Sequence, residues 1–295
     1  MTTDFEDLAT SGGSKPKGQS AHTRMPVVPA VVLSLVVLAA ILAPWIAPHD
    51  PKIGKLSLRL IPPAWQEGGT KEFLLGTDSM GRDILSRVLH GARVSLIVGA
   101  LGSLLAGSIG TFIGLVAGYR RRWVDSLLMR LTDVTLALPL MLMAIVLVAL
   151  LGASFKNVII VIVVLLWPYY ARIVRGETLV IAKSEFVDLA RISGASSTRI
   201  VLRHILPNVM PTILVLATLQ IALIILLEAS LSFLGAGIPP PTPAWGLMVA
   251  DGRDLIGTAW WISVIPGAAI FVVVLATNLL GDWVRDRFDP RLRQL

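Results

Sequence analysis

The sequence predicts an all-α integral membrane protein with six transmembrane helices, and three observations lead to this class. Apolar residues make up 55% of the 295-residue chain and charged residues only 15%, whereas soluble domains carry about 25% charged residues. The apolar residues gather into six runs, most of them near the ~20 residues that a helix needs to cross a bilayer. Lys and Arg cluster at the ends of these runs, as they do beside membrane spans.

The apolar runs and the polar segments between them predict how the chain is organised. The predicted spans cover residues 27–47, 94–118, 131–151, 157–171, 209–234 and 261–280. The fourth span is short, because only fifteen residues separate Lys156 from Arg172, so these two side chains are expected to reach out toward the membrane surfaces. We divide the chain into a disordered N-terminus (1–26), a first transmembrane helix (27–47), an external loop with an interfacial helix (48–93), a five-helix core (94–281) that contains a cytoplasmic loop (176–208), and a C-terminal tail (282–295).

The distribution of basic residues predicts that both termini lie in the cytoplasm. With the N-terminus inside, 17 of the 26 Lys and Arg residues fall in cytoplasmic segments. This bias follows the positive-inside rule. It predicts a multi-pass membrane protein with the loop 176–208 on the cytoplasmic side.

The predicted external loop ends in an amphipathic helix that precedes the second span. Its apolar face consists of Ile84, Leu85, Val88 and Leu89, and its polar face of Arg82, Ser86 and Arg87. This pattern predicts a helix in the membrane interface, and Gly91 is expected to end it. A helix in a water-exposed loop is the alternative.

The second span carries a stripe of small residues. Ala106, Gly110, Gly114 and Gly118 recur at every fourth position, so they share one face of a helix. Small side chains let two backbones approach closely in a membrane. We therefore expect another helix of this chain to pack there.

Residues 184–207 form a polar, cationic island between two apolar runs, and they predict two short helices. Ser184 is expected to cap the first helix, whose one face holds Phe186, Leu189, Ala190 and Ser193. Gly194 stands where a helix commonly ends in a left-handed residue. Ser196 or Ser197 is expected to cap the second helix, and Pro207 to break the chain before the next span.

This island resembles the coupling loop of ABC-importer permeases, whose consensus is Glu-Ala-Ala, three residues, Gly, nine residues, an apolar position, one residue and Leu-Pro. The chain has Asp188-Leu189-Ala190, then Gly194, then His204, Ile205 and Leu206-Pro207 at that spacing. His at the apolar position is typical of peptide/nickel permeases. Four further stretches are similar to C-type permeases of dipeptide and oligopeptide importers: Gly76–Leu96, Glu228–Gly235, Asn278–Asp282 and Asp289–Arg293. Arg120, Arg121 and Arg122 stand where that family usually carries glycines, so the shape of this turn stays open.

The resemblance implies the type I ABC-importer permease fold and a transport subunit that is not itself an enzyme. It implies a homologous B-type permease, two cytoplasmic ATPase subunits (separate or fused) and an external substrate-binding protein as partners. ATP and Mg would be used by the ATPases, with no cofactor on this chain. The residues it assigns to ATPase coupling are Glu185, Phe186, Asp188, Leu189, Ala190, Arg191 and Gly194.

The residue types present argue against other chemistries. The chain has no Cys, which excludes disulfides and thiolate sites. Its four His residues all fall in polar segments without metal-ligand spacing, and no nucleic-acid-binding pattern is present. A phosphate-loop-like string in the N-terminal segment has Gln19 where the essential Lys should stand.

Four polar residues are candidates for a translocation path or gate: Thr218, Gln220, Glu228 and Asp133. An acid inside a span is costly unless it has a partner, so Glu228 is expected either to bond a neighbouring helix or to contact substrate. The predicted function is a permease subunit that moves short peptides by alternating access. A secondary transporter or channel without ATPase partners is the alternative, and nickel, haem, glutathione or sugar remain open as cargo.

Overall fold

The computed structural model describes residues 25–120 and 122–288, so the predicted disordered N-terminus, apart from its last two residues, and the Asp289–Arg293 motif lie outside the described part. Helices dominate these residues, and no strand longer than one bridge occurs among them. The helices are α1 (Val27–Ile46), α2 (Ile84–Arg120), α3 (Arg122–Ala137), α4 (Leu140–Leu151), α5 (Phe155–Ile181), α6 (Glu185–Ile192), α7 (Ser197–Ile200), α8 (Leu206–Phe233), α9 (Trp245–Asp251) and α10 (Trp261–Phe288), with short 3-10 turns at Leu56–Leu58 and Arg253–Leu255 and a π-helical turn at Val201–Ile205.

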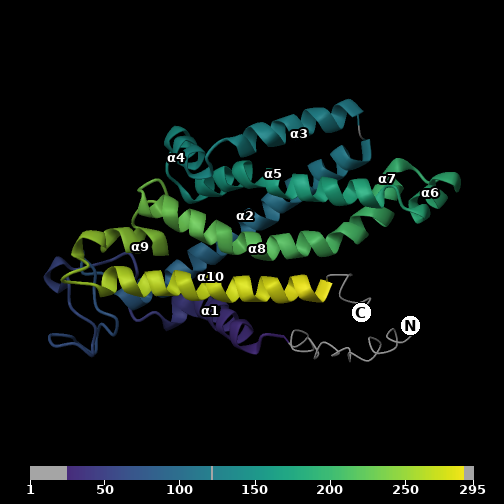
Figure 1. The fold of residues 1–295 in the computed structure, drawn as a ribbon. Helices are drawn as coiled ribbons and strands as arrows, with labels where there is room; N and C mark the ends of the chain where they lie inside the picture. Colours follow the sequence, from purple (N-terminus) through teal and green to yellow (C-terminus); the bar gives the residue numbers. More distant parts are fainter. Residues whose placement is uncertain (1–24, 121, 289–295) are drawn as a thin grey trace, which may run out of the picture.

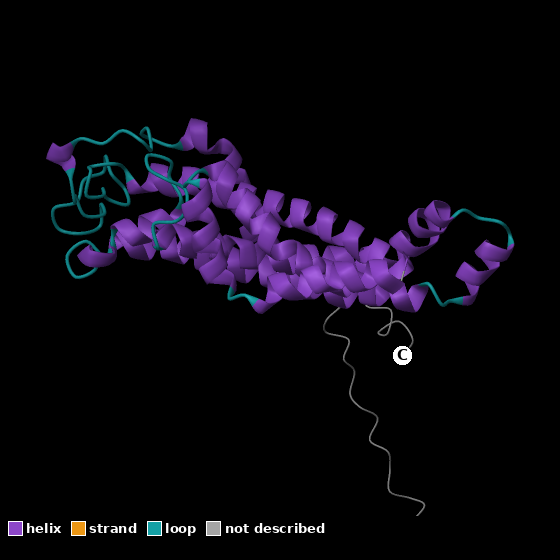
Figure 2. Cartoon of the chain, turned by 90° about the horizontal axis from the view of Figure 1, so that it is seen from above, coloured by secondary structure: helices purple, strands orange, loops and turns teal. Residues whose placement is uncertain are grey.

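The long helices form an elongated bundle in which α2, α5 and α8 pack together, α10 packs on α8, and α1 packs on α2 and α10 (Figure 1). The polar loop before α2 and the short helix α9 lie at one end of the bundle. The helices α6 and α7 project from the other end (Figures 1 and 2). Five helices are long and apolar enough to cross a membrane, and the bent pair α3 and α4 makes up to six.

The small-residue stripe on α2 packs against α5, as the sequence predicts. A Cβ atom added at Gly114 would lie 2.7 Å from the Ala171 carbonyl oxygen and 2.8 Å from the Val174 Cβ. A Cβ at Gly118 would meet the Cβ of Thr178 at 2.7 Å. The glycines are therefore required by the close approach of the two backbones.

The predicted interfacial helix is not a separate element, and Gly91 does not end it. Residues 84–120 form one continuous helix of 37 residues. Gly91 lies inside it because the indole ring of Trp245, from α9, packs where a side chain would be, 2.7 Å from an ideal Cβ. The glycine therefore serves a tertiary contact and not a helix end.

Two of the predicted spans differ in shape from the sequence expectation. The third span is broken between α3 and α4 by a bend of 93°, because Pro139 takes the N-cap position of α4 and cannot donate the hydrogen bond that would continue α3. The fourth span is longer than predicted. It continues past Arg172 to Ile181, because Arg172 and Arg175 pair with acids of α3 and do not mark the end of the helix.

The turn between α2 and α3 places Arg122 at a φ of 57°. This left-handed conformation is strained for residues with a side chain and free of cost for glycine. The backbone of this chain therefore adopts at this turn a conformation that glycine would favour.

Pro207 does not break the chain before the fifth span, contrary to the prediction. The helix runs without interruption from Ser197 to Phe233 through the wider π-helical turn, in which the Leu206 N–H donates to the carbonyl of Val201. Pro207 lies just after this π-helical turn, and a proline or a π-helical turn can kink a helix that still continues.

Candidate functional site

The helix α6 stands outside the bundle but is anchored to it by a buried residue. Val187 is completely buried in a cluster with Ile200, Ile205 and Val209, which join α6 to the start of α8. Ser184 takes the N-cap position of α6, but its side chain does not cap the helix, contrary to the prediction. Its hydroxyl donates instead to the Ile181 carbonyl oxygen at 2.6 Å and closes the turn out of α5.

The opposite face of α6 presents apolar side chains to the surroundings. Phe186 is 44% exposed, Leu189 is 64% exposed and Ile192 is 84% exposed. Ala190, predicted on the same face, turns toward the core cluster and is half-buried. Sequence reasoning missed Ile192, although its position three residues after Leu189 is the helical spacing that would have included it.

Arg191 makes polar contacts both within α6 and with the end of α2. Arg191 donates to the Asp188 carboxylate at 2.8 Å, and its guanidinium lies 5.8 Å from the ring centre of Tyr119 at the end of α2. Gly194 has a φ of +80°, the left-handed conformation that the sequence predicts. Ser196 caps α7 by accepting the Arg199 N–H at 3.4 Å, while Glu185 is exposed in the first turn of α6.

Glu228 lies inside the bundle and contacts two serines. Its carboxylate accepts a hydrogen bond from Ser232 at 2.7 Å and a longer one from Ser95 of α2 at 3.4 Å. The Glu228 side chain has no exposed surface. The sequence left open whether Glu228 bonds a neighbouring helix or contacts substrate. In this conformation its carboxylate forms a hydrogen bond between α8 and α2.

The other three path candidates do not gather around Glu228. Gln220 is almost fully buried in α8, and the Thr218 hydroxyl donates to the Val215 carbonyl of its own helix at 2.8 Å. Asp133 belongs to α3, where it is largely exposed and accepts a hydrogen bond from Arg172 at 2.5 Å. The four residues therefore do not form one site.

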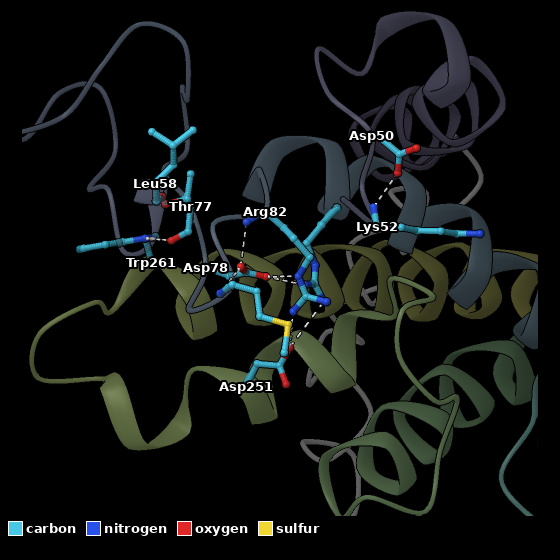
Figure 3. A network of polar contacts seen from close by, with 10 residues as sticks. Asp50, Lys52, Leu58, Thr77, Asp78, Arg82, Asp251 and Trp261 are labelled. Atoms are coloured by element: carbon cyan, nitrogen blue, oxygen red, sulfur yellow. Dashed lines mark hydrogen bonds and ion pairs between the residues drawn. The ribbon is translucent and has the colours of Figure 1, made fainter. Parts of the chain in front are cut away.

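A buried ion network holds the other end of the bundle together (Figure 3). The Arg82 Nε donates to the Asp78 carboxylate at 2.6 Å, and Arg87 donates to the same carboxylate oxygen. Both arginines also reach Asp251 at the end of α9, at 3.4 and 3.5 Å. Burial raises the pKa of the Asp251 carboxyl above its usual range, against the opposing effect of Arg87 and Arg82.

This network corrects the prediction that Arg82, Ser86 and Arg87 form the polar face of an interfacial helix. Arg82 is 5% exposed and Arg87 is 1% exposed, and Ser86 donates to the buried Asp83 at 2.6 Å. Polar residues on one face of a helix indicate that this face is exposed to solvent only when no other part of the chain packs over them. Asp251, about 170 residues further along the chain, gave no local signal that it would be such a partner.

Comparisons with known proteins identify the family. Residues 110–294 match the model of the binding-protein-dependent transport system inner membrane component, and residues 22–63 match the N-terminal transmembrane domain of oligopeptide transport permease C. The chain is 42% identical over 92% of its length to the di/tripeptide transport system permease of Pseudomonas aeruginosa, covering 90% of that protein. It is 44% identical over 91% of its length to the dipeptide transport system permease of Escherichia coli K12, covering 89% of it.

A solved structure agrees in fold. The chain superposes on a subunit of the MetNI methionine ABC transporter in an inward-facing conformation with a TM-score of 0.58, at 16% identity, over 70% of this chain and 97% of that one. At this identity the match concerns the fold, which is that of an ABC-importer permease. The helices, the superposition and the two family models agree: this multi-pass inner-membrane chain belongs to the family of inner membrane components of binding-protein-dependent transport systems.

Proposed function

We propose that this chain is the C-type permease subunit of an ABC importer for short peptides, which moves its cargo by alternating access. The relatives support the cargo class, because those named for di/tripeptide, dipeptide or peptide transport are 40–47% identical to this chain over about nine-tenths of its length. The partners we propose are a homologous B-type permease, two ATPase subunits, separate or fused, and an external binding protein. ATP and Mg would act in the ATPases, and this chain contributes no catalytic group.

The helix α6 is proposed to dock into a groove on an ATPase subunit. The observation that carries this proposal is the exposure of Phe186, Leu189 and Ile192 on a short helix that projects from the bundle. Burying such a side chain is worth about 1.5–3 kcal/mol, and an amphipathic helix laid in an apolar groove is a common recognition mode. Glu185, Asp188 and Arg191 would form the polar rim around these apolar contacts.

The connection from α6 to the spans supports a mechanical role. Val187 is locked between the elements that lead into α8, and α7 continues into α8 without a break. A displacement of α6 is therefore passed to a membrane helix by packed side chains and continuous backbone. Gly194 supplies the only left-handed residue between α6 and α7 within the described part of the chain.

The alternative function, a secondary transporter or channel without ATPase partners, has weaker support. The family to which the chain belongs depends on a binding protein, which such a transporter does not need. The exposed apolar face of α6 also has no role in a protein that acts alone. We therefore retain the ATP-driven importer.

The coupling proposal is tested in proteoliposomes that contain the whole importer. With a dipeptide-loaded binding protein, we expect the wild-type complex to hydrolyse ATP faster than without it. Leu189→Asp should abolish this stimulation, because a carboxylate would have to be buried without a partner, while Leu189→Met keeps the apolar contact and should retain it. Unchanged stimulation in Leu189→Asp would refute the docking role, and no response to any dipeptide in the wild type would refute the cargo.

A further inference from the structure

Two ion pairs join α3 to α5, and they differ in exposure (Figure 1). Arg175 donates two hydrogen bonds to the Asp125 carboxylate, at 2.5 and 2.7 Å, and these side chains are 31% and 16% exposed. Arg172 donates a single one to Asp133, at 2.5 Å, and these side chains are 54% and 64% exposed. The first pair therefore links the helices, whereas the second also presents its charges to the surroundings of the chain.

The exposed surface of α3 is divided lengthwise into two lines of side chains at helical spacing. The apolar line consists of residues that are 55–73% exposed: Trp123, Leu127, Leu131 and Val134. The other line contains only polar or small residues, all exposed: Ser126, Arg130, Asp133 and Ala137. With α4, α3 is apolar enough to cross a membrane. Only the first line suits lipid chains, because charged side chains within a span face a water-filled space or another protein group.

Arg172 lies on the face of α5 that α2 does not cover. Val174 packs against the glycines of α2, and at 3.6 residues per turn a residue two positions away points roughly to the opposite side. Tyr169, which is 40% exposed, and Gly176, which has open space beside it, share this uncovered face. The Asp133–Arg172 pair therefore joins the polar line of α3 to the open face of α5. We call these seven residues of the two helices the polar strip.

The polar strip lies in the half of the bundle that is nearer to α6. Arg172 comes 17 residues after the start of α5, about 26 Å along a helix that leads toward α6. The positive-inside rule places that end of the bundle at the cytoplasm. The strip therefore lies where a cargo would leave the membrane.

We propose that the polar strip lines the cytoplasmic part of the translocation path and that Arg172 binds the terminal carboxylate of the peptide there. This inference rests on the proposed function, since it assigns a cargo contact to this chain. Within the described residues the Arg172 guanidinium makes one hydrogen bond, to Asp133, so its other N–H groups can donate to a carboxylate. Every short peptide with a free C-terminus carries this group, so the contact accepts peptides of any sequence.

Asp133 is the positioning residue for Arg172. Its hydrogen bond holds one side of the guanidinium, and its negative charge repels the carboxylate of the peptide. The contact between Arg172 and the cargo is therefore weak. A translocation path needs such a contact, because its cargo must also leave.

Single cysteines test whether the polar strip faces water, in an importer whose partner subunits contain no Cys. Ala137→Cys should react about tenfold faster than Val134→Cys with a charged, membrane-impermeant methanethiosulfonate, because the reactive thiolate is disfavoured in apolar surroundings. Val134 is the matched control, since it lies one turn away on the apolar line and is 63% exposed. Equally slow reaction of both variants, with and without ATP, would place the strip against lipid or a partner helix and overturn the proposal.

Peptide uptake per ATP hydrolysed tests the role of Arg172 in proteoliposomes of the whole importer. Arg172→Gln should lower the uptake of a labelled dipeptide about tenfold, because a charged hydrogen bond is lost, and Arg172→Lys should restore part of it. Stimulation of ATP hydrolysis by the loaded binding protein should remain, because α6 is unchanged. Lys156→Gln, which removes an exposed charge from the outer end of the same helix, should transport as the wild type does.

The two assays separate this inference from the proposed function. Wild-type uptake by Arg172→Gln would refute the carboxylate contact and leave the importer function intact. If the wild-type complex moved no dipeptide at all, the peptide assignment would fail both for the importer and for Arg172.

Discussion

At the scale of single residues, Asp78 is the centre of the buried ion network formed with Arg82, Arg87 and Asp251. Its carboxylate accepts hydrogen bonds from both Arg82 and Arg87, and also from the backbone N–H groups of Met80 and Arg82 at 2.8 and 2.9 Å. Asp78 and Arg87 are each 1% exposed. A charge buried to this extent is tolerated only while its partner remains.

We therefore expect Asp78→Asn to be strongly destabilising. The substitution keeps the shape of the side chain but leaves two buried arginines with only the partly exposed Asp251 as a counter-charge, and breaking a buried pair costs about 3–5 kcal/mol. The measurement is the thermal unfolding of the purified importer. Asp254→Asn is the control, since Asp254 pairs with Arg253 at the surface and such pairs contribute little. Equal unfolding temperatures for the two variants would contradict the role given to the network.

At the scale of elements, the contact between α2 and α5 leaves no room for side chains larger than hydrogen at three positions of α2. Three glycines of α2 lie so close to α5 that an added Cβ would meet its backbone or the first atoms of its side chains: Gly110, Gly114 and Gly118. Backbone atoms cannot rotate away as a side chain can. The two helices must move apart to accept any larger residue.

Gly114→Leu is expected to destabilise the protein by about 1–3 kcal/mol or more, the usual cost of overpacking. The loss should appear as a lower unfolding temperature and a smaller amount of folded protein in the membrane. Gly176→Ala is the matched control, because Gly176 lies in α5 with open space around it and alanine favours a helix. If Gly114→Leu were as stable as this control, the two helices would not be in close contact.

At the scale of the whole molecule, the charge bias and the fold together set an orientation. The loop before α2 and the helix α6 lie at opposite ends of the bundle (Figure 1). The positive-inside rule then predicts that α6 faces the cytoplasm, where an ATPase could reach it.

Single cysteines can test this orientation, because the chain contains none. Glu67→Cys, in the exposed loop before α2, should react with a membrane-impermeant maleimide in intact spheroplasts. Ser193→Cys, at the exposed C-cap of α6, should react only after the membrane is opened. Labelling of Ser193→Cys from outside would remove the basis for ATPase coupling.

Local patterns in the sequence were sufficient for the fold class, for five of the six predicted spans as single helices and for the left-handed Gly194. They were also sufficient for the stripe that ends in Gly118, because one helix face is described by its spacing alone. They failed where a distant residue decided the outcome. Arg87 was predicted on the polar face of an interfacial helix because its partner Asp251 lies far away in sequence. Gly91 was predicted as a helix end because no local pattern shows that Trp245 packs against it.

The continuous course of α2 has a consequence for the bilayer around the protein. At about 1.5 Å per residue, its 37 residues extend roughly 55 Å, well beyond the ~30 Å hydrocarbon layer. The helix α2 contains no Pro that would kink it. We therefore expect it to adapt to a change in bilayer thickness by tilting and not by bending. A tilt of α2 would move the Asp78 cluster at one end and the Tyr119–Arg191 contact at the other end in opposite directions. The motions of the two ends of this subunit would therefore be coupled.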